Sequence, residues 1–228
     1  MVRRPPSELF RVQIEKRVER LGAIAGIVGP LLLSAYFAAP ALAAWPFSGA
    51  SPDALIAYAR AHELLFYAGG WLQATGALLS SVFFLVLVQL TGARDRLEGM
   101  VVAVGVAVLL SLVLVEGALL EAVPIAAFNG DRATVATAFA LSNGVFARIF
   151  PLAPAPMIFA GSGFALRRVP LIPSWFGTAA LVIAALFVVS GFAAVFVPAG
   201  LVLAIVMSIV EAVWILAAAI VLAKVAWR

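Results

Sequence analysis

The stretch VVAVGVAVLLSLVLVEGALLEA, residues 101–122, decides the fold class of this chain. Residues 101–115 contain no charged side chain. A helix needs about 20 apolar residues to cross the hydrocarbon core of a bilayer, so this run predicts a membrane-spanning helix. Glu116 and Glu121 interrupt its second half. Because a charge in hydrocarbon costs several kcal/mol, these carboxylates indicate a protein interior, a water-filled cavity or the membrane surface.

The composition of the whole chain places it among membrane proteins. Hydrophobic residues make up 65% of its 228 residues and charged residues only 11%, and the mean hydropathy is +1.15. Soluble domains average about 45–50% apolar and about 25% charged residues. We therefore predict an all-α polytopic membrane protein, a bundle of six transmembrane helices with short amphipathic surface helices.

Composition also disfavours several kinds of site. The chain has no cysteine, which excludes disulfides and thiolate sites. His62 is the only histidine, whereas zinc and haem sites typically draw on several His or Cys ligands. Although the net charge is +4, the basic residues are spread along a membrane chain. We expect no metal, no cofactor, no catalytic residue and no nucleic-acid partner.

Six apolar runs divide the chain into one transmembrane domain, residues 21–228, and a polar segment before it. The predicted spans are 21–44, 64–90, 100–122, 143–166, 174–197 and 201–223. Residues 1–20 are predicted to be an amphipathic cytoplasmic segment with a short helix over 7–20, in which Phe10, Ile14 and Val18 recur at helical spacing. The alternative is a simple lead-in to the first span, whose basic residues set the topology.

The distribution of positive charge predicts the orientation. Twelve of the 15 basic residues lie in the N-terminal segment, the 91–99 and 167–173 connections and the C-terminus, all on one side. By the positive-inside rule, both termini are cytoplasmic, and we expect the protein in a bacterial plasma membrane. The longer loops, 45–62 and 123–142, then lie outside. Ser51-Pro52-Asp53 in the first and residues 133–141 in the second predict surface helices.

The candidate functional site is a set of polar residues inside or at the ends of the apolar runs. Arg148 stays protonated and needs a partner, and Glu116 has the matching predicted depth. Glu211 lies near the middle of the last span without an obvious counter-charge. The full candidate set comprises Glu116, Arg148, Glu211, Asn143, Glu121, Glu63 and His62. The alternative is purely structural: an Arg148–Glu pair pins two helices and Glu211 is a hydrogen-bonded packing residue.

The fourth run contains the sequence FPLAPAP, residues 150–156, with Pro151, Pro154 and Pro156. Each proline removes a backbone donor and strains the preceding turn. We therefore predict a helix break, which either lines a site or is a kink satisfied by neighbouring polar groups. Trp71, Gln73 and Trp214 could line a cavity near it, although aromatic residues in a bundle more often serve packing.

Two segments carry a resemblance. SPDALIAYARAHE at 51–63 and LIPSWFGTAALV at 171–182 resemble uncharacterised bacterial six-span membrane proteins of the domain-of-unknown-function type. The resemblance implies the six-helix membrane fold over most of the chain. It implies no activity, so no functional residue is carried over.

Three functions are compatible with these features. The first is a non-enzymatic accessory or scaffold subunit, which binds a protein partner or a second copy of the chain through its polar pairs and surface helices. The second is a small proton- or solute-coupled transporter with a polar cavity in its outer half. The third is a lipid-binding protein in which Arg148 meets an anionic headgroup.

Overall fold

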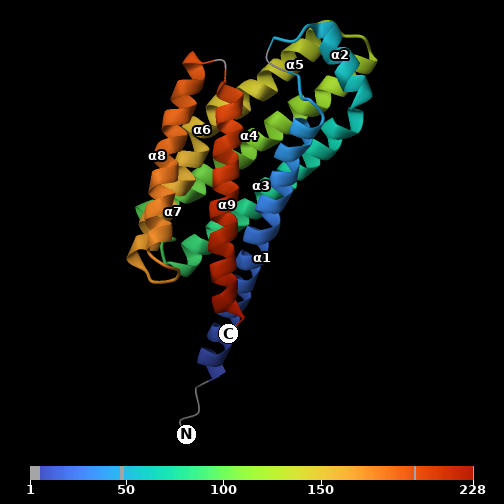
Figure 1. The fold of residues 1–228 in the computed structure, drawn as a ribbon. Helices are drawn as coiled ribbons and strands as arrows, with labels where there is room; N and C mark the ends of the chain where they lie inside the picture. Colours follow the sequence, from blue (N-terminus) through green and yellow to red (C-terminus); the bar gives the residue numbers. More distant parts are fainter. Residues whose placement is uncertain (1–5, 47–48, 198, 228) are drawn as a thin grey trace.

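The computed structural model describes residues 6–46, 49–197 and 199–227, and every regular element in these ranges is a helix (Figure 1). Six helical segments are long and apolar enough to cross a membrane. This confirms the predicted all-α bundle and the six spans of an integral membrane protein. The long elements are α1 (Pro6–Leu42), α3 (Glu63–Leu90), α4 (Leu97–Phe128), α8 (Trp175–Phe196) and α9 (Gly200–Ala226).

The first span is longer than the sequence analysis predicted. The expected amphipathic segment is not a separate helix, because α1 runs without a break from Pro6 into the apolar part of the chain. Its first turns extend beyond the rest of the bundle (Figure 1). Residues 1–5 of the predicted segment lie outside the described residues.

The fourth crossing is a composite of several helices. It begins with α5 (Arg132–Gly144), continues through one π-helical turn, Val145–Ile149, and a short α6 (Phe150–Leu152), and ends with α7 (Pro154–Arg168). Between α6 and α7 the backbone of Ala153 leaves helical geometry, with φ −121° and ψ −75°. The predicted break is therefore present. Its cause is Pro154, which has no amide hydrogen to bond to Phe150.

The two ends of the bundle differ in chemistry. The beginning of α1, the end of α9 and the α3–α4 and α7–α8 connections lie together at one end (Figure 1). The described basic residues of these connections and of the last turns of α7 and α9 are Arg94, Arg96, Arg167, Arg168 and Lys224. We call this the basic end.

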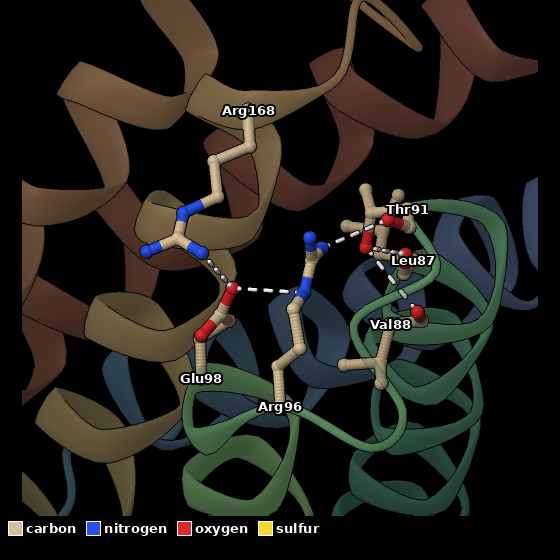
Figure 2. A network of polar contacts seen from close by, with 6 residues as sticks. All are labelled: Leu87, Val88, Thr91, Arg96, Glu98 and Arg168. Carbon is tan, nitrogen blue, oxygen red and sulfur yellow. Dashed lines mark hydrogen bonds and ion pairs between the residues drawn. The ribbon is translucent and has the colours of Figure 1, made fainter.

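A buried carboxylate holds the basic end together. Figure 2 shows Glu98, at the start of α4, between the side chains of Arg96 and Arg168. Its Oε1 lies 3.1 Å from Arg96 Nε and 3.3 Å from Arg168 Nη1. These are ion pairs without the alignment of a hydrogen bond. Arg96 Nη2 also donates to the carbonyl of Thr91 at 3.0 Å. One carboxylate thus links the α3–α4 turn to the end of α7.

The opposite end, which we call the cap end, carries the surface helices α2 (Pro52–Ala61) and α5. Both were expected from the sequence. The Ser51 side chain accepts a hydrogen bond from Ala54 N and caps α2, and Asp131 caps α5 in the same way through Thr134 N. Arg132 Nη1 lies 2.6 Å from Asp53 Oδ1 and joins the two helices.

An aromatic cluster lies beneath α2 and α5. The ring of Trp45 packs against Tyr58, Phe66 and Phe139, with centroid distances of 5.9, 5.2 and 5.4 Å. Phe66 and Phe139 are buried in a hydrophobic cluster separate from the main core of the bundle. The cap end therefore has a small core of its own.

Two glycines bring α1 and α3 into backbone contact. A Cβ atom on Gly29 would lie 2.7 Å from Ser80 N and 2.9 Å from Gly76 O. A Cβ atom on Gly76 would lie 3.0 Å from Gly29 O. Since backbone atoms of a neighbouring helix cannot move aside cheaply, only glycine fits at these two positions. This contact sets the register between α1 and α3 directly beside the candidate site.

Candidate functional site

A cavity in the bundle is lined by residues of α1, α3, α4, α9, the π-helical turn and α6. It provides about 40 Å³ for the centres of water molecules, enough for about three of them. Most of its wall is apolar. Its polar lining residues are Gln73, Ser80, Glu116, Ser208 and Glu211, and each is at most 6% exposed. Two of the predicted site residues, Glu116 and Glu211, therefore line the same cavity.

Glu116 is held in place by two donors from neighbouring helices. Tyr36 on α1 donates its hydroxyl to Glu116 Oε1 at 3.3 Å. Gln73 on α3 donates its Nε2 to Glu116 Oε2. Both oxygens of the carboxylate are therefore used, and its position depends on the packing of α1 and α3 against α4.

Several buried polar atoms around this cavity have no hydrogen-bond partner within the described ranges. They include Gln73 Oε1, Ser80 Oγ and Ser208 Oγ. Glu211, one turn after Ser208 on α9, likewise makes no hydrogen bond or ion pair there with another described residue. Buried polar groups are normally satisfied, and each one left unsatisfied costs about 1–3 kcal/mol. Such a group of orphaned atoms facing one cavity is typical of a site that binds a polar ligand or ordered water.

The predicted pairing of Arg148 with Glu116 is wrong. Among the described residues no ion pair involves Arg148, and its side chain is exposed on the surface of the bundle. Water or lipid headgroups can satisfy such an exposed guanidinium.

The remaining predicted polar residues lie outside the cavity. Glu121 and Glu63 are exposed. His62 stacks on Tyr58 with a centroid distance of 4.2 Å. Asn143 Nδ2 donates to the carbonyl of Phe139 at 2.9 Å. These four predicted residues do not meet Glu116 and Glu211.

The broken fourth crossing contributes to the cavity wall. Val145 and Phe146 of the π-helical turn and Phe150 of α6 line the cavity. Phe146 also packs against Phe37 of α1, with a centroid distance of 5.3 Å. The three prolines follow this aromatic stretch without lining the cavity themselves. The π-helical turn and α6, which precede the break, thus contribute Phe146 and Phe150 to the cavity wall.

Of the aromatic and amide residues expected near a cavity, only one lines it. Gln73 does so, as described above. Trp71 is 62% exposed and points away from the bundle. Trp214 is buried in the main core, where its indole nitrogen donates to the carbonyl of Phe176 at 3.1 Å.

Comparison with family models, with curated proteins and with solved structures found no match for this chain. Among the described residues there is also no group of three or more His, Cys, Asp or Glu side chains that could hold a metal ion. Evidence for the function of this protein therefore comes from the cavity and the side chains that line it.

Three residues of the site were not predicted: Tyr36, Ser80 and Ser208. Each is a hydroxyl in a largely apolar helix, and such residues often bond to their own backbone. Sequence spacing offered a weak signal, since Ser80 follows Gln73 by two turns and Ser208 precedes Glu211 by one turn, which puts each pair on one helix face.

Proposed function

We propose that this protein is a small membrane transporter that carries protons or a small cationic solute, with this cavity as its binding site. One observation carries the proposal. Two carboxyl side chains, Glu116 and Glu211, line a cavity whose described lining contains no basic residue. Carboxylates inside a membrane protein are expensive to bury and mark ion and proton pathways. A bound cation offsets that cost.

The orientation follows from the charge distribution. We propose that the basic end faces the cytoplasm of a bacterial cell and that the cap end faces outward. Glu211 lies 11 residues from the start of α9 at Gly200, or about 16 Å along the helix. Glu211 and the cavity then lie near the middle of a hydrocarbon core about 30 Å thick, and the ion pairs around Glu98 lie at the cytoplasmic end of the bundle.

Flux measurements in proteoliposomes test this function. We expect uptake of protons or of a small cation by the wild type, and loss of uptake in Glu116→Gln and Glu211→Gln. Glu121→Gln is the matched control, because it removes an exposed carboxylate outside the cavity and leaves uptake unchanged. Absence of uptake by the wild type for protons and for a panel of small cations would contradict the proposal.

A second candidate function is an accessory subunit. The first turns of α1 extend beyond the bundle, and Ile14 and Leu21 are about half exposed there beside Lys16 and Arg17. Such a helix suits a protein partner or a second copy of the chain. A partner that co-purifies at a fixed ratio, and is lost when residues 1–15 are removed, supports this function. A chain that remains alone and unchanged by the truncation contradicts it.

Arg148 supports a role for membrane lipids as partners. Its exposed side chain on the surface of the bundle allows contact with an anionic headgroup. We expect Arg148→Ala to lower the amount of anionic lipid that co-purifies with the protein, without changing solute uptake. An unchanged lipid content would remove Arg148 as a headgroup ligand.

A further inference from the structure

We infer that the cavity binds a small protonated primary amine, with its ammonium group beside Glu211 and its carbon atoms against the phenylalanines. This inference deepens the proposed transport function by naming its solute class. Binding itself does not depend on transport, so the two can be tested separately.

The hydrogen-bonding groups of the cavity select the head of the ligand. Gln73 uses its Nε2 to donate to Glu116, so its Oε1, an acceptor, is the atom left without a partner. The carboxyl of Glu211 and the hydroxyls of Ser80 and Ser208 can also accept. A ligand that satisfies these groups must bring several donors. An alkylammonium group brings three donors and a positive charge on one nitrogen, which matches this set.

The charge of the site also favours a cationic ligand. Glu116 and Glu211 are the only titratable residues among the described lining residues, and both are acidic. Arg148 belongs to the π-helical turn that lines the cavity, but its side chain is exposed on the surface of the bundle. An anionic ligand would therefore face two carboxyl groups with no compensating cation, whereas a cation pairs with them.

The apolar part of the wall selects the rest of the ligand. Phe37, Phe146 and Phe150 form an aromatic side of the cavity, with Phe146 and Phe150 stacked at a centroid distance of 5.9 Å. Aromatic faces attract ammonium cations and pack against carbon chains. A bare metal ion has no carbon chain to pack against these rings. Room for about three water molecules limits the ligand to about three to five non-hydrogen atoms, the size range of ethylammonium.

Titration calorimetry on the full chain in lipid nanodiscs tests the inference. The probes are ethylammonium, tetraethylammonium, which exceeds the cavity, and sodium. We expect ethylammonium to bind and the other two to give no heat. Glu211→Gln and Ser208→Ala should each weaken binding about tenfold or more, because each weakens or removes an acceptor of a hydrogen bond from a charged donor. Glu121→Gln is the control and should bind as the wild type does.

The possible results separate the inference from the proposed function. No ethylammonium binding by the wild type, or equal binding by Glu211→Gln and wild type, overturns the amine site. Binding of sodium in place of ethylammonium overturns it in favour of a metal cation. Proton uptake without amine binding leaves the transport function intact and removes the amine. Amine binding without any flux supports the site and contradicts transport.

Discussion

The contact between Gly29 and Gly76 makes a prediction that ties packing to the site. Replacing Gly29 by alanine places a Cβ atom 2.7 Å from the backbone nitrogen of Ser80 and 2.9 Å from the carbonyl of Gly76. Because both are backbone atoms, α1 and α3 must separate. Overpacking of this kind costs about 1–3 kcal/mol, against which the better helix propensity of alanine recovers up to about 1 kcal/mol. We expect a net loss of about 1–2 kcal/mol.

The matched control is Gly117→Ala on α4, where a Cβ atom meets nothing within 4 Å. There only helix propensity changes, and we expect stability to stay constant or to rise by up to about 1 kcal/mol. Unfolding of the purified protein by sodium dodecyl sulfate in mixed micelles, followed by circular dichroism, measures both variants. Equal stability of Gly29→Ala and wild type, or equal losses for the two variants, would refute the close approach of α1 and α3.

The same substitution has a functional consequence. Tyr36 lies two turns after Gly29 on α1, and Gln73 lies one turn before Gly76 on α3. Separation of the two helices therefore moves both donors relative to Glu116. We expect Gly29→Ala to reduce uptake in proteoliposomes at temperatures where the variant is still folded, while Gly117→Ala retains it.

Three further predictions concern the two ends of the bundle. Glu98→Gln removes the carboxylate between two arginines and, because both arginines are partly exposed, should cost about 1 kcal/mol in unfolding experiments, less at high salt. The hydrogen bond from the Thr134 side chain lowers the pKa of Asp131. The stabilisation of α5 by this cap is therefore present above the usual aspartate pKa and is lost as the pH falls through the lowered value. Hydrogen exchange in the first turn of α5 should accelerate in acid, with a weaker pH dependence in Asp131→Asn. Trp45→Ala should lower stability by about 2 kcal/mol, below the 3–5 kcal/mol of fully buried aromatics because Trp45 is half-buried, and the lipid-facing control Trp71→Ala should not.

Much of the fold could be predicted from the sequence because its signals are local. Apolar runs of membrane-spanning length predict the six spans, Ser51-Pro52 predicts the start of α2, and the prolines after Phe150 predict the broken crossing. Each depends on chain length or on the chemistry of neighbouring residues, which the linear sequence contains.

The candidate site could be predicted only in part. Glu116 and Glu211 stand out because charge is rare in apolar helices. Gln73 was also named, but its pairing with Glu116 and the roles of Tyr36, Ser80 and Ser208 were not predicted, because hydropathy does not tell which face of an apolar helix points inward. Arg148 was paired with Glu116 from depth alone, and depth does not tell which side of the fourth crossing the side chain occupies; the structure leaves Arg148 exposed on the surface of the bundle.

The central claim is that Glu211 and Ser208 face a cavity that admits a small cation. The chain has no native cysteine, so a single thiol can be introduced without background. The test variant is Ser208→Cys, and the control is Ser162→Cys, which is buried on α7 away from the cavity. Both are treated with 2-aminoethyl methanethiosulfonate. The cysteine thiolate attacks this reagent, forms a disulfide with its aminoethylthio group and releases methanesulfinate. We expect Ser208→Cys to be modified and protected by ethylammonium, while Ser162→Cys remains unmodified. An unreactive Ser208→Cys, or two variants that react alike, would contradict the account.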